Sequence, residues 1–251
     1  MPRARHSAGY SDYGWLTGLV SELLLNPSAP GTRMYFGMPG SGKSWLARHD
    51  ALASGRRLLV IDTTCKDDWI NRRTKYLPPD VRAWLRAGRA RRMAVVSDFS
   101  GYRDEWKKGT PLIVVQASSD DEKAAILANA VKQEGIAIVI HETHTLNHEA
   151  MGSVDYIATQ WRHHELAAFL DSQRPARIPT TVKELATQTH VFTLVGPRDR
   201  AACEEIVTGD VSAFARVHAQ VCALHSKGVR GAHVALDETR AGPYTVRQVR
   251  S

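Results

Sequence analysis

The sequence predicts an α/β fold in which helices flank a mostly parallel central sheet. Short apolar runs, several of them continuous and β-branched, alternate along the chain with longer stretches of helical periodicity. This alternation is typical of strands that are covered on both faces and joined by crossover helices. The composition is that of an ordinary globular protein, with 43% hydrophobic and 24% charged residues in a chain of 251. Wholly disordered and fibrous classes are therefore excluded.

The expected elements follow from the apolar pattern in chain order. Residues 1–32 form a helical lead-in, because Trp15, Leu19 and Leu23 recur at helical spacing before the segment NPSAPG ends the pattern. Strands are expected at 34–36, 58–61, 93–96, 112–115, 136–140, 166–170 and 191–194, and helices at 43–54, 119–133 and 155–165. The part from about residue 201 onward is expected to form one or two helices and a hairpin (HVALDE, AGP, YTVRQV). We therefore expect a core at 33–200 and a C-terminal appendage at 201–251.

Three features predict where the protein works. No apolar run approaches the roughly 18 residues of a transmembrane helix, so none is expected. The first residues, MPRARHSAGYSDYGWL, lack the apolar stretch and cleavage site of a signal peptide. Cys65, Cys203 and Cys222 are widely spaced and offer neither a disulfide framework nor a zinc pattern, which indicates a reducing compartment. The sequence therefore predicts a cytoplasmic protein.

A glycine-rich motif, GMPGSGKS at residues 37–44, matches the pattern G-x-x-x-x-G-K-[ST] in full. A short strand (MYF) precedes it and a helix (KSWLARHDALA) follows, which is the context that a phosphate-binding loop needs. Glycines let backbone N–H groups turn toward a polyphosphate, and the start of the helix adds the positive end of its dipole. The motif therefore predicts a nucleoside triphosphate site, and it narrows the fold class to a P-loop NTPase.

Within this loop, individual residues have expected tasks. Lys43 would reach the β- and γ-phosphates, and the hydroxyl group of Ser44 would hold Mg²⁺. ATP and Mg²⁺ are the expected ligands. The predicted ATP contacts are Gly37, Pro39, Gly40, Ser41, Gly42, Lys43, Ser44 and Trp45.

Hydrolysis also requires a carboxylate at the tip of a nearby strand, to position Mg²⁺ or to polarise water. Two apolar runs offer one. The run LLVID ends at Asp62, where the strand directly after the phosphate-loop helix is expected. The run IAIVIHE ends at Glu142 after a longer excursion, which suits a strand inserted next to the phosphate-loop strand. The pattern of the residues leaves both candidates open.

Three segments resemble the HerA/FtsK branch of P-loop ATPases: IAIVIHETHTL (136–146), QWRHHELAAFLDSQR (160–174) and RPARIPTTVKELATQTHVFTLVGPRDR (174–200). That family typically shows a strand ending in Asp-Glu-Ala-His, then an Arg-containing helix end, and then a strand closing on Thr-Gln-Arg-Pro. The most specific match is SQRPARIP after an apolar strand. With the phosphate loop, the resemblance covers roughly residues 33–200 and implies a RecA-like central sheet.

The resemblance also implies roles for three residues outside the phosphate loop. Glu142 would orient the attacking water and help to hold Mg²⁺, and Gln173 would sense the γ-phosphate from the neighbouring strand. Arg162 would act as a finger on the nucleotide of an adjacent subunit, which implies a homo-oligomeric, hexameric ring. Other candidates for the finger are Arg174, Arg177, Arg198 and Arg200.

One position departs from the family pattern, since His141 stands where the family has Asp before the catalytic Glu. A neutral imidazole is a poor Mg²⁺ ligand compared with a carboxylate or water. Three explanations stay open at this point. Water fills that part of the metal shell with Ser44 as the main protein contact, or Asp62 supplies the charge from a neighbouring strand, or hydrolysis is slow or conditional.

The positive charge of the chain is concentrated in one insertion. The whole sequence carries a formal net charge of +7, and residues 66–108 hold twelve basic and six acidic side chains. Lys and Arg that neutralise phosphates give sequence-independent affinity for DNA, and aromatic residues in the insertion offer stacking partners for bases. The alternative is a solvated helical face whose aromatics belong to the core, with RAWLRAGRARR as an amphipathic helix and Trp84 packed inward. The aromatics are Trp69, Tyr76, Trp84, Phe99, Tyr102 and Trp106.

The chain most resembles the compact genome-packaging ATPases of tectivirus-like, internal-membrane phages. This resemblance implies that ATP hydrolysis drives double-stranded DNA into a preformed capsid. The expected partners are double-stranded DNA, further copies of the chain and capsid vertex proteins, in the host cytoplasm or on the virion. Three alternatives stay open: an assembly ATPase like those of filamentous phages, a P-loop kinase for small molecules, and a nucleotide switch that barely hydrolyses ATP.

Overall fold

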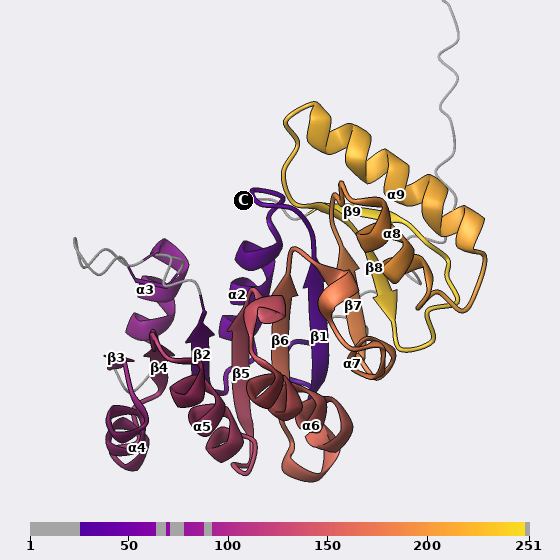
Figure 1. The fold of residues 1–251 in the computed structure, drawn as a ribbon. Helices are drawn as coiled ribbons and strands as arrows, with labels where there is room; N and C mark the ends of the chain where they lie inside the picture. The colour runs from indigo at the N-terminus through magenta and orange to yellow at the C-terminus, as the bar shows by residue number, and fades with distance from the viewer. Residues whose placement is uncertain (1–25, 64–68, 71–77, 88–91, 249–251) are drawn as a thin grey trace, which may run out of the picture.

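The computed structural model describes residues 26–63, 69–70, 78–87 and 92–248. Within these residues, nine strands form one sheet in the order β3-β4-β2-β5-β6-β1-β7-β8-β9 (Figure 1). The strands β1 to β7 pair in parallel with one another, and β8 and β9 extend the sheet antiparallel beyond β7. The predicted α/β fold with a mostly parallel sheet is confirmed.

The strands agree with the predicted apolar runs with one exception. They are β1 (Gly31–Phe36), β2 (Arg57–Asp62), β3 (Met93–Val96), β4 (Leu112–Val115), β5 (Ile136–His141), β6 (Ala167–Ser172), β7 (Gln188–Val191), β8 (Ala232–Asp237) and β9 (Val246–Gln248). The exception is β7, which was expected at 191–194. Its ladder with β1 ends at the pair Phe36 and Val191, because β1 gives way to the phosphate loop there. The predicted C-terminal hairpin is present as β8 and β9.

Helices cover both faces of the sheet (Figure 1). They are α2 (Lys43–Ala53), α3 (Pro79–Ala87), α4 (Phe99–Lys107), α5 (Asp120–Ala130), α6 (His148–His164), α7 (Thr180–Glu184), α8 (Pro197–Glu204) and α9 (Val211–Ser226), with short 3₁₀ turns η1 (Thr143–Thr145) and η2 (Pro175–Arg177). Helix α6 starts seven residues before the predicted 155, because the Asn147 side chain caps it by accepting from the Ala150 N–H at 2.9 Å. The lead-in helix lies outside the described residues up to position 25.

Two apolar cores follow from the alternation of side chains along each strand. In β2, Leu59 and Ile61 face the core that includes α5 and α6, whereas Leu58 and Val60 face the core that includes α2. All these side chains are fully buried, so each of them contributes about 1.5–3 kcal/mol of burial free energy. The sheet is therefore a rigid layer between two packed faces.

The strand order corrects one prediction. We expected the strand ending at Glu142 to lie next to β1, but β6 lies between β5 and β1. Strand β6 pairs with both neighbours, through Leu170 to Met34 of β1 and to Ile140 of β5. Because all three strands are parallel, their carboxyl ends meet at the same sheet edge, where ligands bind in open α/β folds. Among the described helices, none is both long and apolar enough to cross a membrane.

Candidate functional site

The loop between β1 and α2 is shaped by glycines that no other residue can replace without a shift. A Cβ atom on Gly37 would lie 2.7 Å from both Phe192 Cβ and Ser41 Oγ. Gly40 and Gly42 have φ angles of 73° and 103°, in the left-handed region that glycine adopts readily. Gly42 is also the N-cap of α2, and no described side chain caps this helix start. The first N–H groups of α2 are therefore directed to an anion site.

Hydrogen bonds from three directions hold this loop in place. The Gly37 N–H donates to the Ser172 carbonyl of β6 at 3.1 Å, and the Met38 N–H donates to the Thr193 carbonyl at 2.9 Å. On the other side, the Gly231 N–H donates to the Ser41 carbonyl at 3.0 Å. The loop is therefore a preformed cradle.

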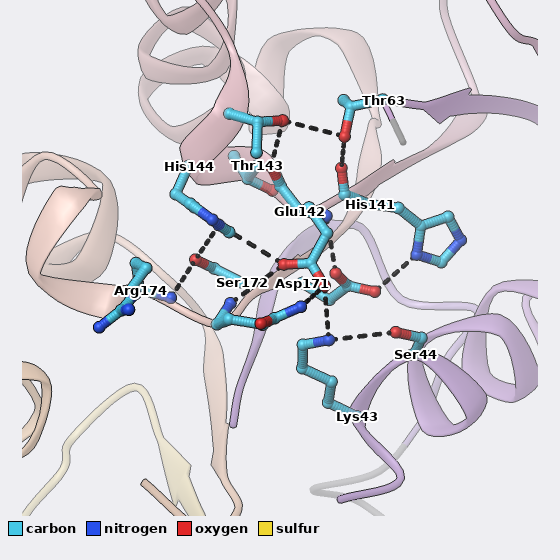
Figure 2. Close-up of polar contacts among 12 residues, drawn as sticks. Lys43, Ser44, Thr63, His141, Glu142, Thr143, His144, Asp171, Ser172 and Arg174 are labelled. Atoms are coloured by element: carbon cyan, nitrogen blue, oxygen red, sulfur yellow. Dashed lines mark hydrogen bonds and ion pairs between the residues drawn. The ribbon is translucent and has the colours of Figure 1, made fainter. Parts of the chain in front are cut away.

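Lys43 and Glu142 form a buried ion pair at the mouth of this cradle. Lys43 Nζ lies 2.9 Å from Glu142 Oε1, and the two residues are only 4% and 7% exposed. Figure 2 shows the two side chains pointing toward each other from α2 and from the end of β5. Lys43 Nζ also lies 3.4 Å from Ser44 Oγ. A positive charge, a carboxylate and a hydroxyl group thus converge beside the phosphate loop.

Glu142 is held in a conformation that non-glycine residues rarely adopt. Its φ of 49° and ψ of 49° place it in the left-handed region, at a cost of about 1–3 kcal/mol. Its backbone N–H donates to Asp171 Oδ1 at 2.8 Å. Its carboxylate accepts from Gln173 Nε2 at 2.5 Å and from the Gln173 backbone N–H at 3.2 Å. Contacts on three sides therefore fix the direction of this carboxylate.

His141, the departure from the family pattern, forms a buried chain with Trp69 and Asp171. Trp69 Nε1 lies 2.6 Å from His141 Nε2, and His141 Nδ1 lies 2.5 Å from Asp171 Oδ2. An indole N–H can only donate, so Nε2 accepts and the proton of the neutral ring sits on Nδ1. Burial favours the neutral acid, but His141, Lys43 and the Glu142 N–H together hold the pKa of Asp171 well below its usual range. Both nitrogens of His141 are thus engaged, and the ring is unsuited to hold Mg²⁺.

The residues that remain fit a magnesium ion. The Ser44 hydroxyl group stands in the first turn of α2 beside the Lys43 ammonium group, and the Glu142 carboxylate lies across from them. Oxygen donors with room for water are the set that Mg²⁺ prefers. Asp62, the other candidate carboxylate, is buried on β2 and accepts from Gln116 Nε2 at 2.8 Å.

Solved structures share this architecture. The genome packaging NTPase B204 of Sulfolobus turreted icosahedral virus 2, in complex with AMPPCP, superposes with a TM-score of 0.58 at 15% identity over 90% of this chain and 100% of that one. The chain has the fold of a P-loop ATPase. The DNA-packaging ATPase B204 of Sulfolobus turreted icosahedral virus matches with a TM-score of 0.55 at 12% identity, covering 90% and 100% of the two chains. ATPases 2 and 3 of EccC from Thermomonospora curvata match with a TM-score of 0.51 at 13% identity, covering 90% of this chain and 38% of that one. The sequence matches no protein-family model and no curated protein.

Within this P-loop ATPase fold, Lys43, Ser44, Glu142 and Gln173 come together as predicted from the sequence, whereas Arg162 does not join them. It lies in the last turn of α6, which runs back from the carboxyl edge of the sheet to the amino edge. Because α6 has 17 residues and therefore spans about 25 Å, Arg162 is far from the carboxyl edge of the sheet in its own chain. The Arg162 guanidinium instead lies over the Trp161 ring, 4.9 Å from its centroid.

The alternative arginines are closer to the carboxyl edge of this P-loop ATPase fold. Two of them, Arg174 and Arg177, follow directly after β6, and the other two, Arg198 and Arg200, lie in α8. All four side chains are exposed. Arg174 Nη1 is 3.2 Å from Asp199 Oδ2. Trp45, a predicted ATP contact, stacks on His49 at 5.2 Å and packs partly against the core below α2.

Asp171 is the residue of the site that sequence reasoning missed. It accepts from both His141 and Glu142 and is 1% exposed. The available signal was an acidic residue inside the apolar strand AAFLDS, since an isolated carboxylate is rarely buried without a partner. His144 also lies at this site, with its Nδ1 3.0 Å from Ser172 Oγ. Partial burial lowers the pKa of His144 despite the charge of Glu142 nearby.

The basic insertion is only partly described, and Tyr76 lies outside the described residues. Trp69 and Tyr102 are fully buried, and Trp84, Phe99 and Trp106 pack partly against the cores. The described aromatics therefore belong to the core, as the alternative interpretation expected, and base stacking by them is disfavoured. The basic side chains behave differently, because a set of them is exposed, namely Arg82, Arg86, Arg92, Arg103, Lys107 and Lys108.

Proposed function

We propose that the protein is an ATPase that translocates double-stranded DNA, acting as a genome-packaging motor in the cytoplasm of an infected host. The observation that carries the proposal is the buried pair of Lys43 and Glu142, in contact with the half-buried Gln173, beside a helix start at the phosphate loop that no described side chain caps. Among the solved structures with this fold, B204 is described as a genome packaging NTPase. The shared fold links DNA packaging to this chain by analogy.

The geometry supports a division of tasks in ATP hydrolysis. Lys43 exchanges its contact with Glu142 Oε1 for the β- and γ-phosphates, which frees the carboxylate to polarise the attacking water. Ser44 would hold Mg²⁺, and the ion would supply positive charge against the phosphates. Gln173 touches Glu142 through both its side chain and its backbone N–H. It is therefore placed to respond when a γ-phosphate draws Lys43 away.

The proposed motor is a ring of subunits, and the position of Arg162 is compatible with a role across the subunit boundary. Its place at the amino edge of the sheet separates it from the phosphate loop of its own chain. A finger role for Arg162 therefore requires a neighbouring subunit, as in a hexamer. The exposed arginines and lysines of the basic insertion supply a surface for the DNA backbone. Capsid vertex proteins are the expected docking partners.

Measurements of ATP turnover with and without double-stranded DNA test the proposal. Turnover should rise with DNA, fall steeply with added salt in its DNA-stimulated part, and disappear in Lys43→Ala and Glu142→Gln. Lys132→Ala, an exposed lysine at the end of α5, is the matched control and should leave turnover unchanged. Activity that ignores DNA but needs a small phosphate acceptor would indicate a kinase instead. Tight ATP binding without turnover under any condition would indicate a nucleotide switch.

A mixing experiment tests the ring. Arg162→Ala should bind ATP normally, lose turnover, and reduce the activity of wild-type subunits when the two are mixed. Normal turnover by Arg162→Ala subunits on their own contradicts the finger assignment.

A further inference from the structure

The loop between α9 and β8 lies against the phosphate loop (Figure 1). The Gly231 N–H donates to the Ser41 carbonyl at 3.0 Å. A Cβ atom on Gly42 would lie 3.1 Å from the Gly231 backbone, so the two loops pack with no room between them. Glycines at both ends, Gly228 and Gly231, have φ angles of 84° and 77° and give this loop its tight turn. A segment close to the C-terminus is thereby fastened to the nucleotide cradle.

This packing brings one charged side chain to the cradle. A Cβ atom on Gly40 would lie 3.7 Å from Arg230 Nη1, so the guanidinium group lies beside the phosphate loop at Gly40. Gly40 belongs to the backbone whose N–H groups face a bound polyphosphate. Arg230 itself is exposed, and its side chain therefore has space to reorient.

Arg230 has no acidic partner within the described residues. Its Nη1 contacts the two ring nitrogens of His225 at 2.9 and 3.2 Å, and no ion pair to a described carboxylate accompanies them. Partial burial and the positive charge of Arg230 lower the pKa of His225, so this ring is neutral near pH 7 and leaves the guanidinium charge unbalanced. An uncompensated guanidinium beside a phosphate loop is suited to receive an anion, because its planar fork matches phosphate oxygens in bidentate geometry.

We propose that Arg230 is a phosphate-binding residue of the nucleotide site in its own subunit, held over the triphosphate by the α9–β8 loop. When a nucleotide enters the cradle, the guanidinium moves from His225 to the phosphate oxygens. The inference rests on the proposed ATPase function for its ligand. It adds a second positive charge to the one on Lys43, from the opposite end of the chain.

Equilibrium binding of AMPPCP, measured by calorimetry at fixed salt, tests this proposal without requiring hydrolysis or DNA. Arg230→Ala should weaken binding about 10-fold, which is the effect of losing one charge-assisted hydrogen bond to phosphate. Arg230→Lys should keep part of the affinity. Lys227→Ala is the matched control, since it removes an equal charge from an exposed position in the same loop, and it should leave binding unchanged.

Four outcomes overturn the inference or separate it from the proposed function. Wild-type affinity in Arg230→Ala contradicts it, and so does an equal loss in Lys227→Ala, which would indicate only a general field of positive charge. If Lys43→Ala loses AMPPCP binding while Arg230→Ala keeps it, the nucleotide site stands and this inference alone fails. If Lys43→Ala also binds normally, the nucleotide site itself is wrong. His225→Ala should bind at least as tightly as wild type, because it removes the competing partner of Arg230.

Discussion

Replacing Asp171 by Asn tests the buried chain that positions Glu142. Asp171 accepts two hydrogen bonds, from the Glu142 N–H and from His141 Nδ1. An amide offers one accepting oxygen and one donating nitrogen, so one of these two donors would face another donor. His141 cannot avoid this conflict by moving its proton, because Trp69 Nε1 donates to its other nitrogen.

The size of the effect follows from leaving one buried donor without a partner. We expect Asp171→Asn to lower the free energy of unfolding by about 1–3 kcal/mol. Turnover should fall as well, because the Glu142 N–H is one of the contacts that hold Glu142 in its left-handed conformation. Denaturant unfolding measures the first quantity, and steady-state ATP hydrolysis measures the second.

A second substitution, at Trp69, tests the tautomer of His141. In Trp69→Phe the indole donor is gone, so His141 can place its proton on Nε2 and accept from the new amide through Nδ1. Asp171→Asn should therefore cost less stability in the Trp69→Phe background than in the wild type, and the difference is a coupling free energy. An equal cost in both backgrounds would refute the proposed tautomer and the chain built on it.

Three further predictions concern other positions. The pKa of Asp171 is depressed in the folded state, so its contribution to stability is present above the ordinary aspartate pKa near 4 and is lost as the pH falls below that value. Lowering the pH should therefore destabilise the wild type more than Asp171→Asn. His190 is buried, and neither of its ring nitrogens has a hydrogen-bond partner among the described residues; burial also lowers its pKa. His190→Phe should therefore raise the free energy of unfolding by about 1–2 kcal/mol. It should also reduce the stability that the protein loses below about pH 6.5. Gly37→Ala should abolish ATP binding, since the new Cβ would lie 2.7 Å from Phe192. Gly152→Ala is the control, because this helix position has open space around it, and it should stabilise the fold by about 0.5–1 kcal/mol. Equal ATP affinity in both variants would contradict the steric argument.

The local parts of this protein were predictable from the sequence because their signals act over short distances. The strand, glycine loop and helix around Lys43 lie within about twenty consecutive residues, and each has its own pattern. The same holds for the apolar run that ends at Glu142. Even there, the end of β7 was misplaced, because a strand stops where its partner stops, and that partner is distant in sequence.

The parts that could not be predicted depend on strand order. Periodicity shows that a strand exists, but it does not show which strand lies beside it. Inserting β6 between β5 and β1 brings Asp171 against His141 and Glu142, and this contact supplies a buried carboxylate next to the position where the family has one. The sequence pattern alone showed His141 as a departure from the family and left three explanations open.

By itself, the sequence predicted a parallel α/β layer and a phosphate loop with Lys43 and Ser44, since composition and spacing are enough for each, and it offered Asp62 and Glu142 as candidate carboxylates. Only the tertiary structure decided that Arg162 lies at the opposite edge of the sheet and that Arg230 lies over Gly40, from which it is 190 positions away in the chain. The physical reason is that side chains meet through the packing of strands and loops, and that packing depends on the whole chain at once.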